Sequence, residues 1–268
     1  MRRSLEKEMM DLPGNRRDLL EEDLANLRTI NRRLGAYRGL LGYLRSLART
    51  SRVKSFSLLD MGTGGGDIPV AIARWARSEG IDVKIVGLEL DQVTLDVARR
   101  QSQNYPEISL VRADVFRPPF SRSVFDFVHA SQLLHHFSEN QIVALLKGWS
   151  RVARRGILVS DLIRHPLAYY GIGALTRLFS RNQMTRTDAP LSVKRAFTLN
   201  EWKGLFSQAG IGSAQVAQLF PFRIFAFFPL DSPKTMPQGA SFRAAALSLT
   251  PLDIEEKGAD RSKGSRIR

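Results

Sequence analysis

The stretch LLDMGTGGGDIPVA, residues 58–71, contains the residue types of a ligand-binding turn. A short apolar run ends at Asp60, four glycines follow within residues 62–66, and Asp67 comes directly after them. Glycines between a strand and a helix let the backbone approach a ligand closely, and the first amides of the helix point toward it. Acidic side chains on both sides of the turn favour a ligand that carries hydroxyl or cationic groups.

The spacing of these glycines excludes two phosphate-binding loops. A Walker-type loop ends in Gly-Lys-Ser/Thr, whereas this chain reads GDI at 66–68. The dinucleotide fingerprint G-x-G-x-x-G needs glycine at its sixth position, which is Asp67 counted from Gly62 and Pro69 counted from Gly64. An acidic side chain in the loop would also repel a pyrophosphate.

Three later segments place polar side chains where further short apolar runs end. Glu89 closes the run in VGLELD (86–91), Asp114 follows the run in VRADVF (111–116), and FDFVHASQLLHHF spans 125–137. In open α/β sheets, ligands bind at the carboxyl ends of the strands. In such nucleotide sites, an acid that binds the ribose follows the glycine turn by about 20 residues. Glu89 fits that position.

The spacing Asp60-x-Gly62-x-Gly64-x-Gly66, with these three segments in order, resembles the class I S-adenosylmethionine-dependent methyltransferases. The resemblance covers residues 55–165 firmly and 185–228 more loosely. It implies S-adenosylmethionine as cofactor, with Glu89 at the ribose hydroxyls, Asp114 facing the adenine amino group and Val115 beside the ring. The cofactor-binding residues that it implies are Asp60, Gly62, Thr63, Gly64, Gly66, Asp67, Glu89, Leu90, Asp114, Val115 and Ser131. No metal ligand set is expected.

Several of these acids have a second, purely structural interpretation. Asp67 is equally well explained as the N-cap of the following helix, and Asp114 as a turn residue. Asp91 is expected to be the N-cap of a helix that begins at Gln92, and Asp126 is expected to be structural.

Histidines after the fourth strand are the candidates for catalysis. The sulfonium methyl group is already activated, so positioning for in-line attack does most of the work, and a phenol or ring carbon gains from losing a proton to a base. His135 and His136 are the best-placed bases, the alternative being that they only pack or hydrogen-bond the loop. His129 is expected to face the core. Tyr169, Tyr170 and Arg164 are weaker candidates for contacting the acceptor.

Alternation of short apolar runs with helical periodicity predicts an α/β fold. Strands are expected at 56–61, 83–90, 108–113, 125–130 and 156–162. Helices are expected at 68–78, 92–103, 139–153 and 165–179. Residues 188–211 are expected to form a loop followed by a helix that ends near Gly210. A closing strand pair is expected at 213–228. The predicted fold class is a doubly wound, Rossmann-like seven-stranded sheet, mostly parallel with an antiparallel closing strand, together with N-terminal helices and a helical cover.

The domain organisation follows from the same pattern. Residues 1–54 are expected to form an N-terminal helical cover, 55–230 the methyltransferase domain with a lid insertion at 165–195, and 231–268 a weakly ordered tail. Apolar stripes in 18–49 and 165–195 predict a cover over the acceptor side, so loss of residues 1–49 is expected to spare cofactor binding but to reduce methyl transfer.

Composition limits the functional classes. The chain has no cysteine, which excludes disulfides, thiolate metal sites and the chemistry of C5-pyrimidine methyltransferases. It has no long apolar run and no signal-peptide pattern, so a cytoplasmic protein without a transmembrane segment is expected. The net charge of +14 lies mostly in the flanks, because residues 58–165 hold 13 basic and 12 acidic side chains. Basic flanks leave nucleic acid and peripheral membrane contact open as partners.

The predicted function is methyl transfer to oxygen or carbon of a small, partly apolar acceptor. FTLNEWKGLFSQAGI (197–211) resembles the ubiquinone/menaquinone-type methyltransferases. NLRTINRRLGAYRGLL and DAPLSVKRAFT resemble bacterial methyltransferases associated with type III polyketide synthases, which implies phenolic or quinone-like acceptors in secondary metabolism, some of them lipidic. Two alternatives remain: an RNA methyltransferase, which only the net charge favours, and a regulatory protein that binds S-adenosylmethionine without turnover.

Overall fold

A seven-stranded sheet organises the chain in the computed structural model, which describes residues 1–230. The strand order is β3-β2-β1-β4-β5-β7-β6. β1 to β5 pair in parallel, and β7 is antiparallel to both β5 and β6. The strands are β1 (Ser55–Met61), β2 (Asp82–Glu89), β3 (Ile108–Arg112), β4 (Phe125–Ser131), β5 (Ala153–Leu162), β6 (Gln215–Leu219) and β7 (Arg223–Pro229). The predicted doubly wound, mostly parallel sheet with an antiparallel closing strand is confirmed.

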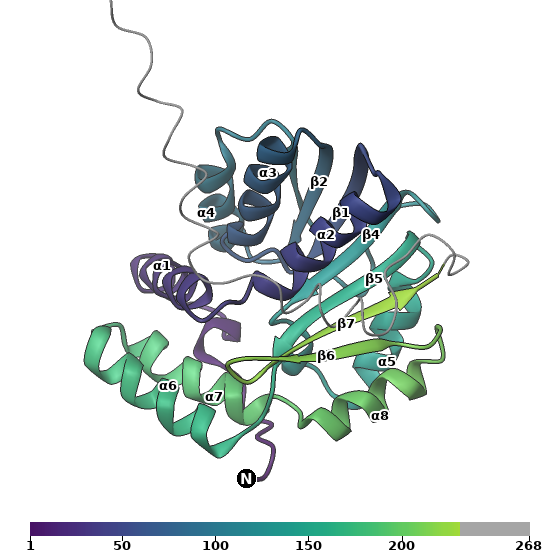
Figure 1. Ribbon diagram of the computed structural model, residues 1–268. Helices are drawn as coiled ribbons and strands as arrows, with labels where there is room; N and C mark the ends of the chain where they lie inside the picture. The colour runs from purple at the N-terminus through teal and green to yellow at the C-terminus, as the bar shows by residue number, and fades with distance from the viewer. Residues whose placement is uncertain (231–268) are drawn as a thin grey trace, which may run out of the picture.

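Helices cover both faces of this sheet (Figure 1). On one face lie α2 (Arg38–Ser51) and α3 (Asp67–Glu79), whose apolar residues form one core with those of β1, β2, β5 and β7. On the other face lie α5 (Glu139–Trp149) and α8 (Leu199–Ala209), around the buried Trp149 and Trp202. α4 (Gln92–Ser102) packs beside α3 and the edge strand β3. Burying both faces explains why the parallel strands read as continuous apolar runs.

Three helices and two short 3-10 turns gather at the carboxyl ends of the parallel strands. α1 (Arg17–Arg33) packs against α4 and α7 (Gln183–Arg195), and α6 (Pro166–Phe179) packs against α7. Figure 1 shows α1, α6 and α7 together on this side of the molecule. The turns η1 (Met9–Asp11) and η2 (Leu134–His136) both contact α7, and η2 also contacts β5.

The N-terminal segment differs from its prediction in one respect. α1 ends near Gly35, which has a left-handed φ of 69°, and α2 then turns onto the sheet instead of joining the cover. Gly39 lies where a Cβ atom would come within 2.7 Å of Leu219 and Phe225, so glycine is required for this close packing. α2 is therefore part of the sheet's core.

Other differences are local. The segment from 188 to 195, expected as loop, forms the second half of α7 and contains Pro190 inside the helix. The helix predicted at 139–153 ends at Trp149 because β5 already begins at Ala153. Within the described residues, no helix combines the length and apolar character needed to cross a membrane. The tail predicted for 231–268 lies outside the described residues.

Candidate active site

The turn between β1 and α3 has the backbone that its glycines predict. Gly62, Gly64 and Gly66 have φ angles of 65°, 55° and 79°, in the left-handed region that glycine tolerates best. A Cβ atom on Gly62 would meet Leu133 at 2.8 Å, whereas one on Gly64 would meet nothing within 4 Å. Gly64 therefore presents bare backbone to open space, which suits close approach of a bound molecule.

The Asp60 carboxylate stabilises this turn through two contacts. It is 2% exposed, and its Oδ1 lies 2.7 Å from Nδ1 of His129, its register partner on β4. Its Oδ2 accepts a hydrogen bond of 2.8 Å from the Thr63 hydroxyl. His129 is fully buried, as predicted for a core histidine. Asp60 therefore joins two strands and fixes the glycine turn.

Glu89 ends β2 beside the same turn. Its Oε2 accepts from the Gly64 amide at 3.0 Å, and its Oε1 accepts from the amides of Leu90 and Asp91 at 2.8 and 3.1 Å. Burial raises the pKa of this carboxyl, while the three amides act in the opposite direction. They hold the carboxylate in one orientation at the sheet edge. Asp91 is the N-cap of α4, as predicted, and accepts from the Thr94 amide at 2.7 Å.

The N-cap interpretation of Asp67 is wrong. Asp67 is the first residue of α3, the N-cap is Gly66, and no side chain caps this helix. The Asp67 carboxylate instead accepts hydrogen bonds from the Tyr37 hydroxyl at 2.8 Å and the Asn31 amide at 3.3 Å. Burial raises its pKa. Asp67 thus ties the segment between α1 and α2 to the glycine turn.

Asp114 takes part in a turn after β3. Its Oδ1 accepts from the Phe116 amide at 2.9 Å, which is the structural role considered for it. Asp126 is also structural, since it accepts from Ser57 and pairs with Arg154 at the opposite end of β4.

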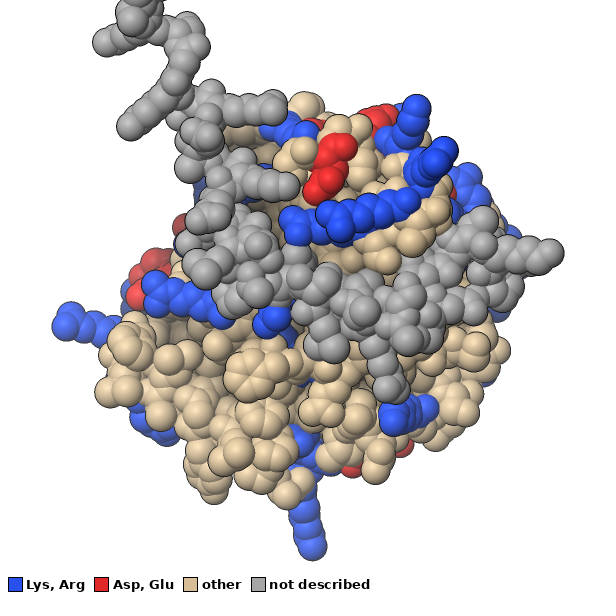
Figure 2. Space-filling model, viewed as in Figure 1, with Lys and Arg blue, Asp and Glu red and all other residues tan. Residues whose placement is uncertain are grey.

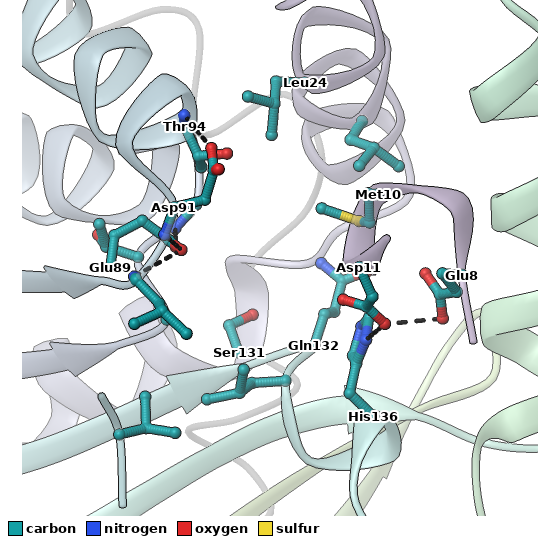
Figure 3. A pocket seen from close by; sticks show the side chains of 18 of the residues that line it. Glu8, Met10, Asp11, Leu24, Glu89, Asp91, Thr94, Ser131, Gln132 and His136 are labelled. Atoms are coloured by element: carbon teal, nitrogen blue, oxygen red, sulfur yellow. Dashed lines mark hydrogen bonds and ion pairs between the residues drawn. The ribbon is translucent and has the colours of Figure 1, made fainter. Parts of the chain in front are cut away.

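A cavity of about 930 Å³ lies at this edge of the sheet and is lined by every predicted cofactor residue except Gly66. Gly66 sits behind it, where a Cβ atom would meet Ala98 of α4 at 3.2 Å. Figure 3 shows Glu89, Asp91 and Thr94 at one end, Ser131 and Gln132 in the middle, and Glu8, Asp11 and His136 at the other end.

Comparison with known proteins agrees with this geometry. Residues 58–156 match the family described as "Methyltransferase domain". The demethylmenaquinone methyltransferase of Bacillus licheniformis is 24% identical over 174 residues, which cover 60% of this chain and 73% of that protein. Residues 58–156 thus match a methyltransferase domain, and this match together with the fold supports a class I S-adenosylmethionine-dependent methyltransferase. A shorter match, 38% identical over 61 residues, covers 20% of a release factor glutamine methyltransferase of Mycobacterium tuberculosis and 23% of this chain.

Solved structures share the fold of this methyltransferase. The plantazolicin methyltransferase BamL, in complex with a triazolic analog and SAH, has a TM-score of 0.59 at 13% identity over 79% of this chain and 98% of its own. Human N-acetylserotonin methyltransferase, in complex with SAM, has a TM-score of 0.57 at 18% identity over 81% of this chain and 57% of its own. A methyltransferase of Aquifex aeolicus has a TM-score of 0.56 at 14% identity, covering 79% and 98% of the two chains. S-adenosylmethionine is the methyl donor of this enzyme.

The residues present fit that cofactor. Gly64 leaves open space above bare backbone, and the Glu89 carboxylate is held at the same point by three amides. A carboxylate accepts about four hydrogen bonds, so Glu89 keeps capacity for hydroxyl donors.

The methyltransferase also has a second, apolar cavity of about 310 Å³. It lies between α1, α6, α7 and the start of β7, and its lining includes Leu34, Leu162, Gly171, Ile172, Val193 and Phe222. Leu27, Asn31, Gln132 and Ser192 line both cavities, so the two adjoin at these residues.

The weaker acceptor candidates are not brought to either cavity. Arg164 forms a two-pronged pair with Glu201 at 2.6 and 2.7 Å, and Tyr170 is 71% exposed. Tyr169 stacks edge-on against Tyr170 and lines neither cavity. Their proposed contact with an acceptor is therefore not supported.

His135 and His136 line the far end of the main cavity, each paired with a carboxylate. His135 is 2% exposed, with Nδ1 2.7 Å from Oδ1 of Asp161. Burial disfavours its charged form, but Asp161 and Glu8 outweigh burial and raise its pKa to about 9. A histidine that is protonated at neutral pH does not suit the role of base. His136 has Nδ1 2.7 Å from Oδ2 of Asp11.

Several residues were not found from the sequence: Glu8, Asp11, Asn31 and Gln132, which line the cavities, and Tyr37 and Asp161, which bond to the lining residues Asp67 and His135. Asp161 had a signal, since it stands at the end of the fifth strand, on the edge where Asp60 and Glu89 end theirs. Glu8 and Asp11 had none. Their segment is brought to the sheet by long-range contacts, among them the Met9 and Met10 amides donating to the Asp188 carboxylate at 2.9 Å each.

Proposed function

We propose that the enzyme transfers the methyl group to an oxygen or carbon of a small, partly apolar acceptor of the phenolic or quinone-like class. The observation that carries the proposal is the apolar cavity adjoining the main cavity at Leu27, Asn31, Gln132 and Ser192. Apolar walls with a few polar groups at one end suit a ring that carries one or two oxygens. The similarity to a demethylmenaquinone methyltransferase supports the same class.

Within this proposal the main cavity binds the cofactor and the apolar cavity binds the acceptor. Glu89 accepts the ribose hydroxyls, Asp114 and Val115 lie at the adenine, and the turn at Thr63 and Gly64 lies against the amino-acid end. S-adenosylmethionine supplies an electrophilic methyl group. Asn31 and Gln132, joined by a 2.7 Å hydrogen bond at the junction, orient the acceptor oxygen for in-line attack.

We also propose α1, α6 and α7 as the cover of the acceptor cavity, in place of the whole of 18–49. α6 carries exposed apolar side chains, Leu167, Tyr170, Leu178 and Phe179, at 68–80% exposure. Figure 2 shows the lower left of this face, where Figure 1 places α6, as mostly uncharged. A rim of this kind favours an apolar or lipidic acceptor over a polyanion such as RNA, which requires basic side chains at its contact surface.

The test is methyl transfer from labelled S-adenosylmethionine to separated small-molecule, lipid and RNA fractions, with Gly171→Phe as the decisive variant. Gly171 lies in α6 at the apolar cavity, and a Cβ atom there meets nothing within 4 Å, so a ring can enter the cavity. We expect transfer to fall at least about tenfold, corresponding to about 1.4 kcal/mol of lost transition-state binding, while S-adenosylhomocysteine binding is unchanged.

Gly148→Phe is the matched control. Gly148 lies in α5, has open space at its Cβ, and lines neither cavity. Equal activity of the two variants would contradict an acceptor in the apolar cavity. Label in the RNA fraction would favour the RNA methyltransferase instead, and binding without transfer to any fraction would favour a regulatory protein.

A further inference from the structure

A cluster of three potential metal ligands lies at the far end of the main cavity. Glu8 comes from the segment before η1, and His135 and His136 come from η2. Oε1 of Glu8 lies 3.5 Å from Nε2 of His135 and 3.8 Å from Nε2 of His136. One ligand atom from each residue lies within 4.8 Å of the others. Residues far apart in the sequence thus aim one oxygen and two nitrogens at a common point.

Two of these atoms have no hydrogen-bond partner although they are buried. They are Oε1 of Glu8 and Nε2 of His135, in side chains that are each 2% exposed. The 3.5 Å between them exceeds a normal hydrogen bond. Ligand atoms that each lie about 2.1 Å from one metal ion are roughly 3–3.4 Å apart. The spacing is therefore close to that of two ligands of a shared ion.

The opposite nitrogen of each histidine is fixed by a carboxylate. Asp161 holds Nδ1 of His135, and Asp11 holds Nδ1 of His136, each at 2.7 Å. Metal-binding histidines commonly donate their second N–H to a carboxylate in this way, which sets the tautomer and aims the other nitrogen at the ion. His129 has the same pairing with Asp60, but it belongs to no ligand cluster among residues 1–230.

We propose that Glu8, His135 and His136 bind one divalent transition-metal ion at the acceptor end of the main cavity. Two imidazoles and a carboxylate suit first-row dications such as Zn²⁺ and Mn²⁺. All three residues line the cavity, so further coordination positions face it. Arg195, whose Nε lies 3.6 Å from the same Glu8 oxygen, balances the carboxylate when no ion is bound.

The role of the ion rests on the proposed function. An acceptor hydroxyl that coordinates the ion is more acidic and releases its proton to solvent. The resulting oxyanion attacks the methyl carbon, a C–O bond forms, the C–S bond breaks, and S-adenosylhomocysteine leaves. The ion would thereby activate the acceptor hydroxyl without a histidine acting as base.

The test is direct metal binding by the full-length protein after treatment with a chelator. Calorimetric titration with Zn²⁺ and with Mn²⁺, with Co²⁺ absorption as a spectroscopic probe, should give one ion per chain for at least one metal. Glu8→Gln and His136→Ala should each weaken binding more than about tenfold, and Asp11→Asn, which alters only the carboxylate behind His136, by about 10–100-fold. His165→Gln is the matched control, because His165 caps α6 and stacks on Phe222 away from the cluster.

Each result decides one point. Absence of binding, or binding that Glu8→Gln and Asp11→Asn leave unchanged, would overturn the metal site and leave an ion-pair cluster with Arg195. Thermal unfolding of each variant shows whether it is folded. If Glu8→Gln does not fold, Asp11→Asn still tests the site. Methyl transfer to the separated fractions by the same wild-type samples separates the two proposals. Transfer to the small-molecule fraction without metal binding ends only the metal site, whereas metal binding without transfer to any small molecule ends the proposed function.

Discussion

At the scale of single residues, acids that end neighbouring strands have different tasks. Both oxygens of Asp60 are engaged inside the protein, by His129 and Thr63. Glu89 is held only by backbone amides and lines the main cavity. Asp60 therefore shapes the turn, while Glu89 is the acid available to a ligand.

Glu89→Ala should weaken S-adenosylhomocysteine binding by about 10–100-fold, because hydrogen bonds to a charged group contribute about 1.5–3 kcal/mol. Calorimetric titration of the folded variant measures it. Asp126→Ala is the control, since Asp126 is an acid at the start of β4, at the opposite edge of the sheet. An unchanged dissociation constant for Glu89→Ala would remove this residue from the proposed cofactor site.

Gly64→Val should abolish cofactor binding and leave the protein folded. The valine would extend into the open space above the turn, and the left-handed backbone adds strain. Gly80→Val separates the two effects, because Gly80 has a similar φ of 67° and open space but ends α3. If both variants bind S-adenosylhomocysteine equally in calorimetry, the glycine turn is no cofactor contact.

At the scale of elements, α1 and α7 meet through a buried acid. Asp23 is fully buried, and its Oδ1 accepts from the Thr185 hydroxyl at 2.6 Å, while Oδ2 has no partner. Burial, and then the nearby carboxylates Asp188, Glu8 and Glu22, raise its pKa to about 7, against the opposing bond from Thr185. The folded protein therefore binds this proton more tightly than the unfolded chain does.

This pKa gives a pH dependence of stability. Because the folded-state pKa is raised, the contribution of neutral Asp23 is full below about pH 4 and is lost as pH rises toward 7. Asp23→Asn should raise the free energy of unfolding at pH 8, by at most a few kcal/mol at about 1.4 kcal/mol per pKa unit. Denaturant unfolding at pH 4.5 and pH 8 checks this. A gain of equal size at both values would show that Asp23 does not titrate between them.

α7 is also the helix that the sequence pattern did not predict in its second half. Pro190 lies inside it, and proline removes one helical hydrogen bond and usually ends a helix. The helix persists because its buried residues, among them Met184, Thr185 and Asp188, are held by α1, α6 and the segment around η1. Tertiary contacts here override the local signal.

At the scale of the whole molecule, the two parts of the N-terminal region differ in what they support. Residues 1–12 are held against the cavity by Arg3. Its guanidinium donates hydrogen bonds to the carbonyls of Arg195 and Phe137 at 2.7 and 2.8 Å. α2 instead buries Leu40, Leu41, Tyr43, Leu44 and Leu47 in the core. The first contact is local to the cavity, whereas the second supports the sheet.

Deleting residues 1–12 should leave cooperative unfolding and S-adenosylhomocysteine binding, and lower methyl transfer. Deleting residues 1–49 should abolish cooperative unfolding, contrary to what the sequence alone predicts. Burying one large apolar side chain contributes about 1.5–3 kcal/mol, so losing the five of α2 matches a typical total stability of about 5–15 kcal/mol. Calorimetric scanning distinguishes the two, and a folded 1–49 deletion would contradict the assignment of α2 to the core.

The sequence by itself determined the sheet, its direction and the cofactor turn. Those features depend on local patterns: apolar runs of strand length, glycines at Gly62, Gly64 and Gly66, and acids at strand ends, which share one edge because the strands are parallel. The tertiary structure alone decided that Asp67 binds Tyr37 instead of capping α3, that His135 is ion-paired, and that Glu8 reaches η2. Each of these contacts joins residues that are 26–127 positions apart. Such pairings depend on how helices and turns pack at the sheet edge, and this packing cannot be predicted from local periodicity.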